Sequence, residues 1–306
     1  MQLALLKYHG LGNDFLVLLD WEGATELNAA TVAGLCDRRR GIGADGVLRL
    51  CAPTGGGSLA MELHNADGGY AETSGNGIRC AVLAAVDEGL VPAGAVRVET
   101  GAGLVDVEVG QRTEFGTSLR VAMGELKVGP GHPAGELALG PDAGAAERAE
   151  LASLAAHTAF RVDIGNPHLV LVGHERVATS ARVPLGRLGP SLEAAVPGGV
   201  NVEVVAPVDG SNTLQFDVWE RGAGLTLACG SGSCAAAAAA RADGVVGDRV
   251  VLHNPGGVLT VELSGDLDRP VAVLVGPAQR IGRIEVSTDG LVASPRASTL
   301  ATLGCP

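Results

Sequence analysis

Aromatic residues, positive charge and long apolar segments are all scarce in this sequence. Aromatic residues make up 3% of its 306 residues, so the stacking surfaces that bind single-stranded nucleic acid are not expected. The formal net charge of −12 also argues against a nucleic-acid partner, because clustered Lys and Arg bind such partners. The alanine run at residues 235–240 is too short to cross a bilayer, and no membrane partner is expected.

The cysteine patterns of disulfide frameworks and zinc sites are also missing. No CxxC pair occurs, and no histidine cluster has the spacing of zinc ligands. Residues 1–6 contain neither a basic region nor a long apolar stretch, so no signal peptide is expected. We therefore expect a cytoplasmic protein without a bound metal, in which the cysteines are free thiols. The cysteines are Cys36, Cys51, Cys80, Cys229, Cys234 and Cys305.

Glycine is abundant, and the other bulk properties are those of a globular protein. The 46 glycines predict many tight turns and places where the backbone closely approaches a ligand. Hydrophobic residues make up 46% of the chain and charged residues 18%, which excludes intrinsic disorder. A chain of this length forms one large domain or two ordinary ones.

The sequence contains one pattern twice. Residues 12–18 (GNDFLVL) and 165–171 (GNPHLVL) agree at five of seven positions. Ser-Gly-Asn-Gly at residues 74–77 is matched by Cys-Gly-Ser-Gly 155 residues later, and an alternating, strand-like pattern ends nine residues before each motif. We predict an α+β fold with two pseudo-symmetric domains that arose by internal duplication. Each half is built mostly of antiparallel strands around one central helix.

The join between the halves is expected at a Gly- and Pro-rich segment near residue 129. This gives a first half of residues 1–128, which the returning chain completes with about residues 278–306, and a second half of residues 129–277. The Ala- and Glu-rich residues 142–157 predict an outer helix of the second half, and residues 295–306 predict a loose tail.

Ser74 and Cys229 stand directly before the two Gly-x-Gly motifs, at the expected start of each helix. Unpaired backbone N–H groups and the helix dipole make such a position electropositive, so it acidifies a thiol and binds a carboxylate. Two such helix ends facing each other can place one group on either face of a substrate α-carbon, the geometry that inverts a stereocentre. Gly-x-Gly alone is common, and a single cysteine more often packs as a small apolar residue. The matched pair favours the catalytic interpretation.

Further motifs resemble the signatures of diaminopimelate epimerases, in the order found in that family. The resemblance implies two domains, each a β-barrel around a central helix, with the substrate between them. It implies an isomerase of lysine and peptidoglycan biosynthesis that converts LL- to meso-diaminopimelate without pyridoxal phosphate, nucleotide or metal. A small amino acid is then the partner, and we expect a homodimer. The motifs lie at residues 7–15, 41–46, 65–68, 74–80, 165–168, 200–203 and 220–232.

The resemblance also assigns roles by position. Ser74 and Cys229 are the implied catalytic pair, and His168 is expected to support the site from behind. The groups that would bind the reacting carboxylate are the backbone amides of Gly75, Asn76, Gly230 and Ser231. The side chains that would recognise the substrate are those of Asn13, Asn65, Asn166, Asn201, Glu220 and Arg221, with Asn65, Asn166, Asn201 and Arg221 at its distal end. Arg suits a carboxylate, and Asn both donates and accepts. Asn13 and Asn65 can also be read as turn residues.

Ser74 departs from the family, which has cysteine at this position. A hydroxyl ionises far less readily than a thiol, so much of the roughly 10²–10⁴-fold contribution of one acid–base group is expected to be lost. Three interpretations remain open: an impaired epimerase, an enzyme that dehydrates or racemises another amino acid with Cys229 as the base, or an inactive diaminopimelate-binding protein. The intact recognition residues favour the first. Leu225 and Gly46 are smaller departures, where relatives carry glutamate and glutamine.

Overall fold

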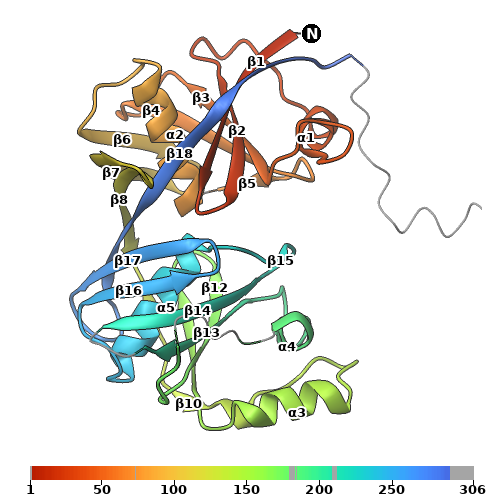
Figure 1. Cartoon of the computed structure of the whole chain (residues 1–306), viewed down its shortest axis with the longest axis vertical. Coiled ribbons are helices and arrows are strands. Elements are labelled where there is room, and N and C mark those ends of the chain that lie inside the picture. The colour runs from red at the N-terminus through yellow and green to blue at the C-terminus, as the bar shows by residue number, and fades with distance from the viewer. Residues whose placement is uncertain (1, 73, 179–182, 184, 209–211, 290–306) are drawn as a thin grey trace, which may run out of the picture.

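The computed structural model describes residues 2–72, 74–178, 183, 185–208 and 212–289. Two barrels lie end to end along its long axis (Figure 1). The predicted tail and Cys305 lie outside the described residues. The helices are α1 (Ala29–Cys36), α2 (Gly75–Asp87), α3 (Ala145–Ser153), α4 (Leu185–Ala194) and α5 (Gly230–Ala242), with a short 3₁₀ turn at Ala134–Glu136.

The first barrel is a closed ring of eight strands. The ring runs β1–β2–β3–β4–β6–β7–β8–β18 and returns from β18 to β1, with β5 added beside β4. Only the β2–β3 and β4–β6 pairs of this ring are parallel. The strands are β1 (Gln2–Gly10), β2 (Asn13–Leu19), β3 (Gly46–Cys51), β4 (Leu59–Asn65), β5 (Tyr70–Ala71), β6 (Ala95–Thr100), β7 (Gly103–Thr113) and β8 (Gly116–Glu125).

The second barrel repeats this order. β9, β11, β12, β13, β14, β16, β17 and β18 pair in sequence, and backbone hydrogen bonds from Leu126 and Val128 to the segment before β18 continue the β8–β18 pairing along β9. The parallel pairs β12–β13 and β14–β16 take the places of β2–β3 and β4–β6. The strands are β9 (Lys127–Val128), β10 (His132–Pro133), β11 (Thr158–Asp163), β12 (Pro167–Val172), β13 (Asn201–Pro207), β14 (Thr213–Glu220), β15 (Gly224–Leu225), β16 (Arg249–Asn254), β17 (Gly257–Ser264) and β18 (Val271–Ser287).

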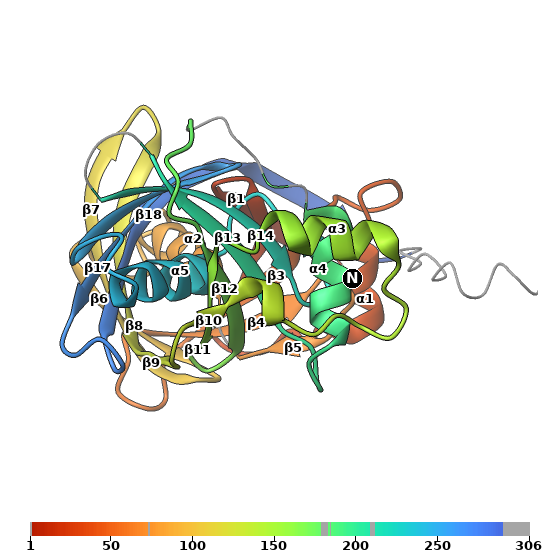
Figure 2. The ribbon, with the colours of Figure 1, turned by 90° about the horizontal axis from the view of Figure 1, so that it is seen from below.

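Each barrel encloses one helix, α2 in the first and α5 in the second. Figure 2 looks along the long axis and shows α5 surrounded by strands, with α1, α3 and α4 outside on one side. Small residues let a helix fit inside a ring of strands, and residues 235–240 of α5 are alanines that are all buried. α3 lies within the segment predicted as an outer helix. The predicted α+β fold of two similar barrels is confirmed. No helix of the described residues is long and apolar enough to span a membrane.

Strand β18 ties the barrels together. It pairs with β17 and β8 in its first part and with β1 in its second, and it crosses both barrels in Figure 1. A second link is the β1–β2 turn, where Leu11 and Gly12 adopt left-handed φ values of 55° and 86°. This turn meets the β16–β17 turn so closely that a methyl group on Gly257 would lie 2.7 Å from Leu11 Cδ2. The segment that carries Asn13 is therefore held against the second barrel.

Candidate active site

The two enclosed helices begin in the same way. Ser74 is the N-cap of α2, and its Oγ accepts a hydrogen bond from Gly77 N at 3.1 Å. Cys229 is the N-cap of α5, and its Sγ accepts from Gly232 N at 3.3 Å. Both capping residues have extended backbone conformations, as helix N-caps do. Each side chain is thus fixed at the positive end of its helix.

The two helix ends touch each other between the barrels. A methyl group on Gly75 would lie 3.6 Å from Gly230 Cα, and one on Gly230 would lie 3.3 Å from Gly75 Cα. Larger residues at either position would push the helices apart. The glycines therefore bring the first free N–H groups of both helices, and the capping residues before them, to one place.

Asn76 bridges the two barrels at this place. Its Nδ2 donates to Asn13 Oδ1 at 3.1 Å in the first barrel and to the Ala228 carbonyl at 3.0 Å in the second. Ala228 directly precedes Cys229. Asn76 is 3% exposed, so this bridge is shielded from water. It fixes the position of the Cys229 cap relative to the first barrel.

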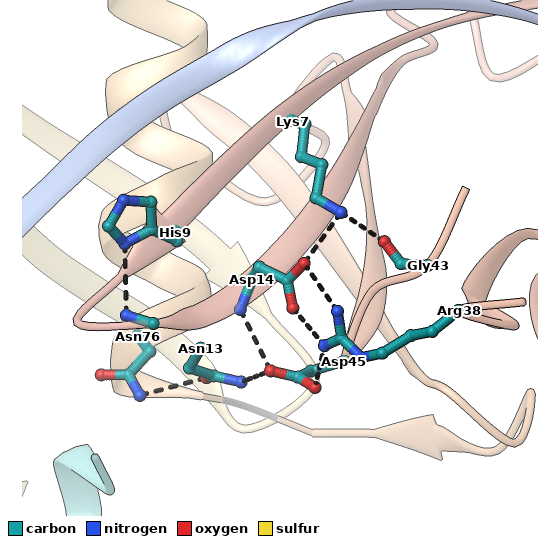
Figure 3. A network of polar contacts seen from close by, with 9 residues as sticks. Lys7, His9, Asn13, Asp14, Arg38, Gly43, Asp45 and Asn76 are labelled. Carbon is teal, nitrogen blue, oxygen red and sulfur yellow. Dashed lines mark hydrogen bonds and ion pairs between the residues drawn. The ribbon is translucent and has the colours of Figure 1, made fainter. Parts of the chain in front are cut away.

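An ion network holds Asn13 from the other side (Figure 3). Asn13 Nδ2 donates to Asp45 Oδ2 at 2.8 Å, and Asp45 in turn pairs with Arg38 at 2.7 Å. Arg38 also binds Asp14 at 2.5 Å, and Lys7 binds Asp14 at 2.8 Å. Burial alone would raise the pKa of Asp14, but hydrogen bonds from Arg38 and Lys7 outweigh it and lower that pKa. Asn13 is therefore a rigidly positioned side chain and not a free turn residue.

Cys229 lies in a buried and acidic environment. The residue is 5% exposed, and its Sγ lies 3.5 Å from Ser231 Oγ. Burial raises the pKa of the Cys229 thiol well above its ordinary value, the charges of Glu220 and Glu203 raise it further, and hydrogen bonds from Ser231 and Gly232 oppose them only in part. The expected acidification of Cys229 by the helix end is therefore wrong, because burial and the two carboxylates raise its pKa more than these hydrogen bonds lower it.

Glu220 and Glu203 form the acidic surroundings. Burial raises the pKa of Glu220, although hydrogen bonds from Thr226 and Cys229 oppose this. Glu203 Oε1 lies 2.7 Å from His168 Nδ1, and both side chains are 0% exposed. Glu203 Oε2 is a buried oxygen without a hydrogen-bond partner in the described part of the chain. Glu203 Oε2 can therefore accept a hydrogen bond from a donor, neutral or charged, that enters this region.

The residues assigned to the distal end form a looser group. Asn201 accepts from the Arg221 backbone N–H at 2.9 Å and donates to the Pro167 carbonyl at 3.2 Å. The Arg221 side chain is exposed and donates to the Gly198 carbonyl at 3.0 Å. Asn166 Oδ1 lies 3.2 Å from His168 Nε2. Asn166, Asn201 and Arg221 therefore lie in one region of the second barrel, where they contact backbone groups and His168 and not one another's side chains in the described hydrogen bonds.

Asn65 stands apart from that group in the contacts of the described residues. It ends β4, is exposed, and pairs with Gly46 across the sheet. A cavity of about 600 Å³ between the barrels is lined by other residues, which come from β1, β7, β8, β17 and β18 and from the β1–β2, β7–β8 and β16–β17 turns. Within the described ranges, no group of three or more His, Cys, Asp and Glu is arranged to hold a metal ion.

The sequence comparison decides the family. Residues 5–128 and 160–281 match the sequence model described as diaminopimelate epimerase. The chain belongs to the diaminopimelate epimerase family. The diaminopimelate epimerase of Thermobifida fusca is 39% identical over 301 residues, covering 93% of this chain and 98% of that protein. The diaminopimelate epimerase of Methanocella arvoryzae is 37% identical over 289 residues, with coverages of 92% and 96%.

Solved structures agree with the fold. A phenazine biosynthesis protein of the PhzF family from Bacillus anthracis superimposes with a TM-score of 0.71, covering 94% of this chain and 99% of that one. Its sequence identity of 13% limits the likeness to the fold. As a member of the diaminopimelate epimerase family, the chain is an isomerase of the amino-acid epimerase type.

Several residues of this diaminopimelate epimerase family site were missed in the sequence. Glu203 lies inside a recognised motif, but its pairing with His168 depends on the parallel β12–β13 register. Arg38 and Asp45 are polar residues of the segment after α1, and nothing local indicates that Asp45 binds Asn13 or that Arg38 binds Asp14 and Asp45. Thr226 contacts Glu220 across the β14–β15 turn. The Glu203–His168 contact and the ion network join segments far apart in the sequence, so the order of the strands is needed to predict them.

Proposed function

We propose that the protein interconverts LL- and meso-diaminopimelate by moving the α-proton, with Cys229 as the principal acid–base group. The observation that carries this proposal is the contact between the N-termini of α2 and α5 at Gly75 and Gly230. Two helix N-termini directed at one place form a binding site for a carboxylate and stabilise the negative charge that develops when the α-proton leaves. The place of action is lysine and peptidoglycan synthesis in the cytoplasm, and the proposed assembly is a homodimer.

In this proposal the amides of Gly75, Asn76, Gly230 and Ser231 bind the reacting carboxylate. Cys229 then faces one side of the α-carbon, and Ser74 faces the other. The thiol must lose its proton before it can act as a base, and the Glu220 carboxylate, which accepts a hydrogen bond from it, is the acceptor in contact. No cofactor is required, since the reaction only moves protons.

The distal end of the substrate would be bound by residues around Arg221. The guanidinium offers a fork for a carboxylate. Asn166 directly precedes β12, and Asn201 begins the neighbouring strand β13. Asn65 would complete this group from the first barrel. Diaminopimelate carries a second ammonium and carboxylate, so it is the amino acid that such a distal site fits.

Proton exchange in D₂O, with LL- and meso-diaminopimelate tested separately, is the decisive experiment. We expect the isomer whose α-hydrogen faces Cys229 to incorporate deuterium, and the isomer whose α-hydrogen faces Ser74 to exchange much more slowly. Exchange at equal rates from both isomers would contradict the assignment of Cys229 as the single competent base. Equal binding of proline-like ligands and diaminopimelate would contradict the distal site.

The Ser74 hydroxyl supports a second candidate, β-elimination of water from a hydroxy amino acid with Cys229 as the base. This candidate predicts release of a keto acid and ammonia without exchange of diaminopimelate. It also predicts that Ser74→Cys gives no epimerase activity. If both the wild-type protein and Ser74→Cys bind diaminopimelate but neither turns over any substrate, the protein is an inactive homologue.

A further inference from the structure

Arg79 in α2 is a cation buried without an anionic partner. Its side chain is 0% exposed, and no Asp or Glu of the described residues contacts it. Burial lowers the pKa of Arg79 to about 10, so it stays charged at neutral pH. An isolated buried charge is costly and is usually neutralised by a carboxylate. This charge is therefore either a burden on the fold or a partner for an anion that arrives from outside.

The contacts of Arg79 point towards the helix end. Nη1 donates to the Gly75 carbonyl at 3.2 Å, Nη2 to Asn76 Oδ1 at 2.7 Å, and Nε to the Pro277 carbonyl at 3.3 Å. Methyl groups on Gly10 and Gly276 would lie 3.1 Å and 3.3 Å from the guanidinium. The slot is thus built for a flat, forked cation.

The second barrel shows that the fold does not require this charge. The equivalent position in α5, 155 residues further along the chain, is Cys234, a neutral buried thiol. α5 is as fully enclosed as α2 without any cation at that position. A structural demand of the barrel therefore does not account for Arg79.

We propose that Arg79 is the positioning residue and counter-charge of the carboxylate site. Arg79 holds Oδ1 of Asn76, which leaves the Asn76 Nδ2 group directed at both Asn13 and Ala228. It also places a positive charge behind the Gly75 and Asn76 amides. The inference rests on the proposed function for the identity of the anion, an amino-acid carboxylate.

Substitutions at Arg79 test this with binding and rate measured separately. Arg79→Lys keeps the charge but cannot contact all three acceptors, and Arg79→Met removes the charge. We expect the Kd for diaminopimelate, measured by calorimetry, to rise severalfold in Arg79→Lys and at least tenfold in Arg79→Met. Arg49→Lys and Arg49→Met are matched controls, because Arg49 is also largely buried but pairs with Asp20 and Glu62 away from the site. They should lower stability and leave Kd unchanged.

The pH dependence separates charge from packing. A buried lysine loses its proton several units more readily than an exposed one. The ratio of KM in Arg79→Lys to KM in the wild type should therefore rise with pH, while the same ratio for Arg79→Met stays flat. The titratable groups that face Arg79 are Cys80 and Cys234. Burial raises the pKa of each thiol to about 12, so neither titrates between pH 6 and pH 9.

Two further measurements keep the inference independent of the reaction. In a double-mutant cycle, Asn76→Ala combined with Arg79→Lys should weaken binding no more than the worse single variant, since one acts through the other. In a crystal structure of Arg79→Lys without substrate, Asn76 should lose its contact to Asn13 or to Ala228. Unchanged Kd in both Arg79 variants, or an unchanged Asn76 in that crystal, would overturn the inference. If the Arg79 variants lose binding but the wild-type protein never exchanges the α-proton, the role of Arg79 in the carboxylate site would stand and the proposed epimerase activity would fail.

Discussion

The N-terminal ends of α2 and α5 have one backbone geometry and two different environments. Both helices are 13 residues long, and both are capped by a side chain that accepts from the glycine three residues on. Under α2, a methyl group on Gly77 would lie 3.3 Å from Leu48 Cδ2. Under α5, one on Gly232 would lie 2.6 Å from Glu203 Oε1. The carboxylate of Glu203 under α5 therefore occupies the place that the Leu48 side chain occupies under α2.

The strand registers extend this comparison. Phe15 is opposite Gly46 in the β2–β3 pair, and His168 is opposite Asn201 in the equivalent β12–β13 pair. The buried Glu203–His168 pair of the second barrel thus corresponds to an apolar Leu–Phe pair in the first. The charges of Glu220 and Glu203 act on Cys229, whereas the side chain under the Ser74 end is that of Leu48. The two helix ends thus share one backbone geometry, and of these corresponding pairs the one at the α5 end is ionisable while the one at the α2 end is apolar.

Removing the thiol is the strongest test of this comparison. Cys229→Ala should lower α-proton exchange by at least the roughly 10²–10⁴-fold that one acid–base group supplies. Ser74→Ala should change exchange only a few-fold, since a hydroxyl contributes little as a base. The measurement is deuterium incorporation by mass spectrometry. Similar losses in both variants would mean that the two ends are chemically equivalent.

Restoring a thiol tests the other end. Ser74→Cys should raise epimerisation, by up to about 10²–10⁴-fold. The gain is expected at the lower part of that range, because the apolar pair of Leu48 and Phe15 offers no proton acceptor to the new thiol. Initial rates of meso-diaminopimelate formation measure it, and Ser74→Thr is the matched control. An unchanged rate would support the elimination candidate.

Much of the fold could be predicted from the sequence, because the duplication is visible in short sequence motifs. Repeated motifs, alternating strands and the two Gly-x-Gly sites indicated two similar halves around helices, and the caps are set by residues next to each motif. The chemistry of Cys229 did not follow in the same way. Its pKa is raised by burial and then by the charges of Glu220 and Glu203, which lie on separate strands. A helix-end argument includes only the dipole, whereas desolvation and charge depend on what packs nearby.

The burial of Arg79 is a second feature that the sequence did not predict. In sequence it is a basic residue on a helix, a type that usually lies at the surface. Its burial follows from α2 being enclosed on every face, which no helical periodicity indicates. The ion network around Asp14 likewise joins β1, β2 and the loop after α1. Contacts between distant segments need the strand order as well as the residue types.

Neutralising Glu203 should change the acid–base behaviour of the Cys229 end, with a smaller effect than the substitutions of Cys229 and Ser74. Glu203 is one of the charges that raise the pKa of Cys229 and of Glu220. Glu203→Gln keeps the volume and the contact to His168 but lowers both pKa values. The limb of the kcat/KM profile that rises with pH should therefore move to lower pH, with a severalfold gain on that limb. Glu262→Gln removes a half-buried carboxylate of β17 that pairs with Arg120 and Arg249, and it should leave the profile unmoved. A profile that is also unmoved in Glu203→Gln would contradict this electrostatic account.

The ion network of the first barrel gives the smallest effect, one on stability. Asp14→Asn leaves Lys7, whose side chain is 14% exposed, without a carboxylate partner, and should lower the free energy of unfolding by about 1–3 kcal/mol near pH 7. Pro167, the equivalent residue of the second barrel 153 positions later, has no charge to lose. Because the pKa of Asp14 in the folded protein lies below its ordinary value of 3.8, the stabilisation is fully present above that value. It is lost as the pH falls through the folded-state pKa. Urea unfolding at pH 7 and at successively lower pH should show wild type and variant converging in the acid range, and a difference that persists when Asp14 is protonated would mean that packing, not charge, is responsible.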